Sequence, residues 1–304
     1  MTLVLEQFLN GLQFGVTLFL LAAGLTLIFG IMGVINLAHG SLYMIGAYAS
    51  ALTAAKTGSF FAAALAGPLA AGVAGVVIEF LVVRRLYARD HLDQVLATFA
   101  LILIVNQAAT MLVGRQPLFV AIPPALNGSI ELLPGLSYPV YRLAIIAIGL
   151  IVGTGLYLLI NRTRVGMLVR AGATHRDMVS ALGVDIRLLY TAVFGLGALL
   201  AGLAGMMTGP ILAVQVGMGE QILILTFVVV VIGGVGSVRG AFFGALIVGV
   251  VDTILRAFLP GALRQLMTGS EADALGAGLS SMGVYLLMAI VLLVRPKGLF
   301  PAHD

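Results

Sequence analysis

Few side chains in this sequence could carry out chemistry, and several of them occur in one short polar motif. The motif NLAHGS, Asn36–Ser41, places an amide, an imidazole and a hydroxyl within an otherwise apolar run. Polar groups in an apolar surrounding are costly unless they face a passage or a partner. Gly33 and Gly40 bracket the motif and permit a broken helix whose freed backbone groups line that passage. We predict a substrate pathway that contains Asn36, His39, Gly40, Ser41 and Asn106.

A second interpretation of this motif stays open. It is a short turn at a membrane surface, in which Asn36 caps the following helix and His39 lies at the interface. No other histidine or carboxylate stands at ligand spacing from His39, so we expect no metal there.

Other ionisable residues within apolar runs are few, and each has a basic neighbour. Glu79 precedes Arg84 closely, and Asp252 lies four residues before Arg256, so we expect both carboxylates to be paired. The sequence contains no carboxylate pair, Ser/His/Asp set or HExxH motif. We predict a protein that is not an enzyme and that needs no cofactor and no metal.

A glycine-rich stretch, Ile232–Gly249, raises the question of phosphate binding. The Walker pattern requires a lysine followed by serine or threonine after the last glycine, and this stretch has neither. Glycines four residues apart instead form a ridge of small residues that suits tight helix crossing. We predict a packing hairpin built on Gly233, Gly234, Gly236, Gly240 and Gly244.

A basic island, Asn161–Arg187, separates two long apolar runs. It contains five arginines and two aspartates. Apolar and small residues recur at steps of three and four between Leu168 and Leu182, which predicts one amphipathic helix outside the membrane, ended by Gly183. Such a surface helix suggests that another protein docks on it.

The composition requires an integral membrane protein. Of 304 residues, 61% are hydrophobic and 9% charged, and the mean hydropathy is +1.15. Soluble domains carry about a quarter charged residues. The net charge is +4, and the basic residues cluster in a few short loops, which argues against nucleic-acid binding. Cysteine is absent, which excludes disulfides and thiolate metal sites.

The apolar runs predict an all-α, polytopic protein with about nine transmembrane helices, eight or ten remaining open. We treat residues 1–304 as one transmembrane domain, with a broken helix at 33–41 and a proline-rich extramembrane loop at 114–141. Phe14–Gly30 and Phe194–Gly209 are similar in texture and suggest an inverted repeat, although composition alone also explains the match. The expected spans lie near 8–30, 42–55, 60–83, 95–113, 142–160, 188–214, 222–235, 241–258 and 282–294.

The arginines predict the orientation. If the loop 161–187 is cytoplasmic, alternation places about twice as many basic residues inside as outside, as the positive-inside rule requires. The loop 114–141 is then periplasmic and the C-terminus cytoplasmic, in a bacterial inner (plasma) membrane.

Four stretches together resemble the permeases of branched-chain amino acid (LIV-type) ABC importers, and among them the H-type subunit. They are GVINLAHGSLYMIGAY, RAGATHRDMVSALGVDI, VVVVIGGVGSVRGAFFG and RPKGLF. The resemblance covers nearly the whole chain, and the first and third stretches are specific in combination. It implies a second homologous permease subunit, two cytoplasmic ABC ATPases and a periplasmic substrate-binding protein as partners, beside membrane lipid.

The same resemblance implies residue roles. Arg170–Val184 matches the family's cytoplasmic loop that engages the ATPase, with Ser180 as a minor departure. Asp252 stands where the family often has glutamate, which keeps the local charge. The ATPase-coupling residues implied are Arg170, Ala171, Arg176, Asp177, Ala181 and Gly183.

We therefore expect the permease subunit of an ATP-driven importer for branched-chain or related amino acids or other small polar solutes. It would form half of the translocation pathway and dock an ATPase through a helix at 170–184. The alternative is an autonomous ion-coupled secondary transporter or channel, which would take up a solute without partners. An intramembrane enzyme has no catalytic constellation behind it.

Overall fold

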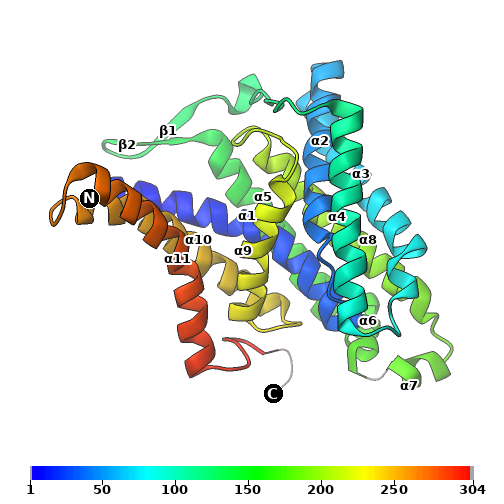
Figure 1. Ribbon diagram of the computed structural model, residues 1–304. Coiled ribbons are helices and arrows are strands. Elements are labelled where there is room, and N and C mark those ends of the chain that lie inside the picture. The colour runs from blue at the N-terminus through cyan, green and yellow to red at the C-terminus, as the bar shows by residue number, and fades with distance from the viewer. Residues whose placement is uncertain (1, 175, 302–304) are drawn as a thin grey trace.

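The protein is a bundle of helices that carries one small β-hairpin (Figure 1). The computed structural model describes residues 2–174 and 176–301, and for Arg176 and Asp177 it describes the backbone alone. The helices are α1 (Thr2–Met32), α2 (His39–Thr57), α3 (Phe60–Leu81), α4 (His91–Val113), α5 (Val140–Arg162), α6 (Arg164–Thr174), α7 (Arg176–Ala181), α8 (Ile186–Thr208), α9 (Met218–Gly233), α10 (Val238–Leu263) and α11 (Gly269–Val294), with short turns η1 (Val83–Arg85) and η2 (Pro124–Leu126).

Among the described residues, 7 helices are long and apolar enough to cross a membrane, namely α1, α3 with η1, α4, α5, α8, α10 and α11. Helix α9 is apolar but has only 16 residues, and α2 has 19. The chain is thus an all-α, polytopic membrane protein, as predicted. The expected number of about nine requires α2 and α9 to be counted with the seven.

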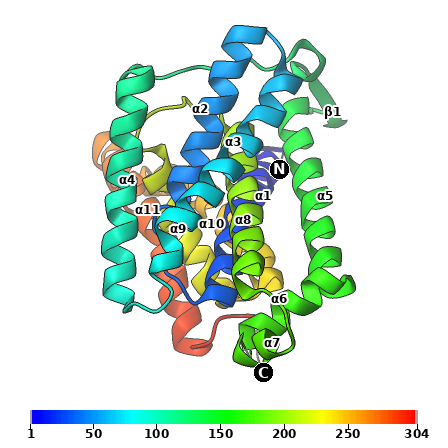
Figure 2. The same ribbon diagram turned by 90° about the vertical axis from the view of Figure 1, so that its right-hand side faces the viewer.

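Two helices form the centre of the bundle. In the most apolar stretch of α1, 83% of residues are buried, and in that of α8, 67%. In the most apolar stretches of α4 and α11, only 11% of residues are buried. Figure 2 shows α4 and α5 at opposite edges of the molecule, with α1 and α8 between them. The exposed apolar side chains of the outer helices therefore form a surface suited to lipid or to another membrane subunit.

The same order of helix pairing occurs twice along the chain. Helix α1 packs most extensively against α10, and α8 packs most extensively against α3. Along the chain, α1 is followed by the short helix α2 and then by α3, the partner of α8. Likewise, α8 is followed by the short helix α9 and then by α10, the partner of α1. Helices α1 and α8 cross at Gly24 and Gly197, where a Cβ added at Gly24 would lie 2.6 Å from the Gly197 carbonyl oxygen.

The two ends of the bundle differ (Figure 1). Strands β1 (Ser129–Leu133) and β2 (Leu136–Pro139) pair antiparallel within the proline-rich loop and mark what we call the hairpin end. Helices α6 and α7 lie at the opposite end, which we call the α6–α7 end. A bridge between Leu118 and Val214 joins the hairpin loop to the segment after α8.

Several helices extend beyond the spans expected from hydropathy. Helix α1 begins at Thr2 instead of residue 8, and α11 begins at Gly269 instead of residue 282. The extra turns contain polar side chains that bond locally, such as Thr268 to Glu271 at 2.7 Å. Hydropathy excludes such turns because it does not register these bonds.

We predict that Gly24→Ala lowers the unfolding temperature of the purified protein in detergent. The new methyl group would press on backbone at the α1–α8 crossing, and overpacking of this kind costs about 1–3 kcal/mol. Gly155→Ala is the matched control, because a Cβ there meets nothing within 4 Å. Equal unfolding temperatures for the two variants would contradict the tight crossing.

Candidate functional site

The basic island is helical in α6, up to Thr174, and in α7, from Arg176. The predicted helix over 168–182, or over 170–184, includes His175 between them, which lies outside the described residues. Helix α6 buries Gly166, Val169 and Gly172, and α7 buries Val179. Both helices therefore bury part of their surface against the rest of the bundle.

The residues with an implied coupling role lie on this pair and on the turn after it. Arg170 is exposed and donates a hydrogen bond to the carbonyl of Ile160. Ala171 is half-buried and Ala181 is exposed. Gly183 ends α7 with φ +85°, in open surroundings. Arg176 and Asp177 belong to α7 by their backbone, and their side chains lie outside the described residues, as does His175.

The α6–α7 pair also presents apolar side chains to solvent. Met178 is 64% exposed and Leu182 is 79% exposed. Leu182 directly follows Ala181, the last residue of α7. Exposed apolar side chains beside arginines suit contact with another protein.

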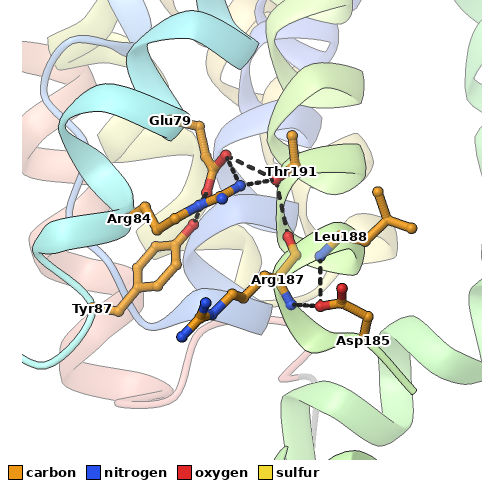
Figure 3. Close-up of polar contacts among 7 residues, drawn as sticks. All are labelled: Glu79, Arg84, Tyr87, Asp185, Arg187, Leu188 and Thr191. Atoms are coloured by element: carbon orange, nitrogen blue, oxygen red, sulfur yellow. Dashed lines mark hydrogen bonds and ion pairs between the residues drawn. The ribbon is translucent and has the colours of Figure 1, made fainter. Parts of the chain in front are cut away.

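A buried carboxylate joins α3 to the start of α8, next to this pair (Figure 3). Glu79 is fully buried. It accepts hydrogen bonds from Arg84 Nε at 3.2 Å and Nη2 at 3.0 Å. The predicted pairing with Arg84 is confirmed.

Two further side chains complete this joint. The Thr191 hydroxyl, on α8, lies 2.8 Å from Glu79 Oε2 and accepts from Arg84 Nη2 at 2.7 Å. The Tyr87 hydroxyl donates to Glu79 Oε1 at 2.5 Å. Burial, and then the hydrogen bond to Glu79, raise the pKa of the Tyr87 phenol, so that this group remains a donor.

The first turn of α8 is itself capped. The Asp185 carboxylate accepts from the backbone N–H groups of Arg187 at 2.9 Å and Leu188 at 3.2 Å. Four residues, Leu182 to Asp185, therefore separate α7 from α8, which is capped and bonded to α3. Displacement of α7 would reach both α8 and α3 through this short connection.

At the centre of the bundle the chain breaks between α1 and α2, within the predicted region 33–41. Gly33 has φ +65°, and residues 33–38 form no helix. Helix α4 bonds to this segment: Ile35 N–H donates to Gln94 Oε1 at 3.2 Å, and Leu37 N–H donates to Thr98 Oγ1 at 3.2 Å. Interrupted backbone at membrane depth requires such partners.

The predicted pathway residues of the NLAHGS motif lie in and directly after this segment, all of them buried. His39 Nε2 lies 3.1 Å from the carbonyl oxygen of Leu21, in the middle of α1, so α2 begins deep inside the bundle. Among the described residues, the side-chain amide of Asn36 and His39 Nδ1 have no hydrogen-bond partner. The residue that precedes α2 is Ala38, so the interpretation of Asn36 as its cap is wrong.

Helix α9 begins beside the start of α2. A Cβ added at Gly40 would lie 2.3 Å from the Gly219 carbonyl oxygen, and one added at Gly219 would lie 2.3 Å from that of Gly40. Asn106 Nδ2, on α4, donates to Glu220 Oε1 at 2.5 Å. The structure therefore brings Asn106 to the junction where Gly40 and Ser41 lie.

Sequence reasoning missed Gln94, Thr98 and Glu220 at this centre. Gln94 and Thr98 are 3% and 0% exposed. Glu220 stands just before an expected span and therefore resembles a loop residue. Gln94, Thr98 and Asn106 are polar residues four and eight positions apart on one apolar helix. Residues at such steps lie near one face of a helix, so this spacing could have predicted a polar face on α4.

The glycine-rich stretch forms the turn between α9 and α10. Gly233 and Gly240 face each other, with a Cβ added at Gly233 lying 2.3 Å from the Gly240 carbonyl oxygen, and one added at Gly244 would lie 2.9 Å from that of Val229. Gly234 and Gly236 lie in the turn with positive φ, so Gly236 is not part of a ridge on α10.

The chain after α11 returns to this turn. Leu299 N–H donates to the Ile232 carbonyl at 2.9 Å, and Phe300 N–H donates to that of Gly233 at 2.9 Å. The terminal residues thus satisfy carbonyl groups at the end of α9.

Seven long apolar helices and two short ones, α2 and α9, with a basic helix pair at one end, define a multi-pass membrane protein among the described residues. The described residues hold no group of three or more metal-ligating side chains. A family model described as branched-chain amino acid transport system / permease component matches residues 7–293. The chain belongs to this permease family.

Individual relatives agree over nearly their full length. BraD of Pseudomonas aeruginosa is 28% identical over 97% of this chain and 95% of its own. LivH of Escherichia coli K12 is 28% identical over 97% of this chain and 94% of its own. Both carry the name of permease protein of a high-affinity branched-chain amino acid transport system. A probable LivH of Methanocaldococcus jannaschii is 28% identical over 93% of this chain and 88% of its own. No solved structure matches the chain significantly.

We predict that Arg84→Met destabilises the protein more than Glu79→Gln. Removal of Arg84 leaves a fully buried carboxylate without its cation, and breaking a buried pair in this way costs about 3 kcal/mol or more. Removal of the Glu79 charge leaves Arg84, whose side chain is 27% exposed and can reach water. Thermal unfolding in detergent measures both variants, and a larger loss for Glu79→Gln would contradict this account of the joint.

Proposed function

We propose that this chain is a permease subunit of an ATP-driven importer for branched-chain amino acids or closely related small amino acids. The observation that carries the proposal is the family match over residues 7–293, together with relatives named for that transport. The chain would form half of the translocation pathway beside a second homologous permease. A substrate-binding protein would deliver the solute at the hairpin end.

Energy enters, in this proposal, at the α6–α7 end. The pair presents arginines and exposed apolar side chains to a cytoplasmic ATPase. Motion of α7 passes through Gly183 to the Asp185 cap of α8. The Glu79 joint then carries α3 along with α8, so that two of the spanning helices respond to one docking event.

The solute path is proposed to pass the junction of α2 and α9. Two helix N-termini approach each other there at Gly40 and Gly219, and helix N-termini stabilise negative charge. A zwitterionic amino acid carries a carboxylate that suits this environment. Asn36, His39 and Ser41 supply buried polar groups at the same junction, and Asn106 reaches it through Glu220.

The orientation follows from the arginines. The positive-inside rule favours the α6–α7 end, with Arg162, Arg164, Arg170 and Arg187, as the cytoplasmic one. The C-terminal segment lies at the same end in Figure 1, which supports a cytoplasmic C-terminus in a bacterial inner membrane.

Reconstitution into vesicles tests the function. The chain with its partner permease, ATPases, binding protein and ATP is expected to accumulate radiolabelled leucine, whereas the chain alone is expected to accumulate none. Uptake by the purified chain alone, driven by an ion gradient, would contradict the proposal and favour an autonomous carrier.

We predict that Gly183→Val lowers ATP-driven uptake at least tenfold in the reconstituted importer while the protein still folds. A β-branched residue is strained at φ +85° and changes the path from α7 to α8. Gly58→Val is the matched control, since Gly58 also has positive φ and open surroundings but ends α2 at the far end of the bundle. Unchanged uptake in Gly183→Val, or an equal loss in both variants, would contradict the coupling role.

A further inference from the structure

A cavity of about 710 Å³ lies at the α6–α7 end, outside the junction of α2 and α9. Helices α1, α5 and α6 and the turn before α10 surround it. Two arginines line it, Arg170 from α6 and Arg239 from the first turn of α10, together with the polar side chains of Asn161, Ser237 and Thr26. Its described lining contains no carboxylate, so the cavity favours a negatively charged occupant.

Thr26, on α1, adds a polar residue to the lining of this cavity. Threonine within a helix commonly donates to the carbonyl four residues earlier, as Thr17, Thr208 and Thr226 do here. Thr26 is 0% exposed and lines the cavity, yet its hydroxyl has no partner among the described residues. A buried hydroxyl without a partner is costly, so a polar occupant that reached Thr26 would gain a hydrogen bond there.

An apolar cleft of about 290 Å³ adjoins this cavity. It lies between α1, α5 and α10, and its lining includes Phe19, Leu150, Gly153, Thr154, Phe242 and Phe243. The two spaces share Tyr157, Val238 and Arg239. The two spaces are therefore neighbours, one with a cationic polar lining and the other with an apolar lining.

We propose that this double site binds one anionic phospholipid. Its phosphate would lie between Arg170 and Arg239, and an acyl chain would lie in the apolar cleft. A free phosphate would leave the cleft unfilled, and an acidic peptide would place polar backbone against the phenylalanines. Basic pockets between transmembrane helices on the cytoplasmic side bind acidic headgroups, and the positive-inside orientation puts this site at that leaflet.

A lipid acyl chain in the cleft would lie between α5 and α10. Helix α5 packs on α1 but makes little contact with α10, and the cleft lies between them. An acyl chain there would cover the edge-on pair Phe19 and Phe242, whose ring centroids lie 5.1 Å apart. The headgroup would contact α6 through Arg170.

Native mass spectrometry of the full-length chain tests the site. The purified protein is incubated with equal amounts of phosphatidylglycerol and phosphatidylcholine in detergent, and the lipid retained per chain is measured. One phosphatidylglycerol is expected to remain on the unsubstituted protein, in at least tenfold preference to phosphatidylcholine. This comparison requires no variant, and equal retention of the two lipids would overturn the proposal.

Variants then locate the bound lipid. Arg239→Gln is expected to lower phosphatidylglycerol retention about tenfold, since hydrogen bonds to charged groups are worth about that factor or more. Thr154→Phe, which fills the cleft without a change of charge, is expected to lower it similarly. Arg89→Gln is the control, because Arg89 is exposed on the turn before α4 and lines neither space.

Three outcomes would contradict the site. An equal loss in Arg89→Gln would indicate attraction to the basic surface in general. Full retention in Thr154→Phe, with displacement of the lipid by inorganic phosphate, would indicate a small-anion site without an acyl chain. Full retention in Arg239→Gln would remove the headgroup assignment.

Discussion

The structure depends on one constraint, which is that polar backbone groups inside a membrane must find partners within the protein. Residues 33–38 interrupt the helical ladder in the middle of the bundle. Gln94 and Thr98 bond to alternate N–H groups of this segment, and so α4 is bonded to the centre although it lies at an edge and most of its surface is exposed. Without these bonds the segment would have to continue as helix, and α2 could not begin at the depth of Leu21.

Close glycine contacts make the rest of this arrangement possible. The start of α2 meets the start of α9 at Gly40 and Gly219, and the two central helices cross at Gly24 and Gly197. Lipid provides no hydrophobic force between helices, so association relies on such backbone approach and on buried polar bonds. The short helices are thereby enclosed by long ones, and the polar junction lies away from lipid. The Glu79 joint extends the same principle to the α6–α7 end, where it bonds α3 to α8.

The sequence was informative wherever one residue type determines the outcome. Gly33 and the polar run after it predicted the break, long apolar runs predicted the spanning helices, and Gly183 predicted the end of α7. The partners of these features depend on tertiary contacts, which neither hydropathy nor periodicity contains. Ile35 and Gln94 are 59 residues apart, and Glu79 and Thr191 are 112 apart.

The central claim is that this permease receives its energy from outside, through the α6–α7 pair. The chain contains no cysteine, so a single cysteine introduced at Leu182 can be cross-linked specifically in the assembled importer. Leu182 is 79% exposed at this end, whereas Leu132 is 40% exposed on the hairpin. We predict that Leu182→Cys cross-links to the ATPase with a yield that changes on ATP binding, and that Leu132→Cys does not. The absence of any cross-link from Leu182→Cys, or an equal yield from both positions, would contradict it.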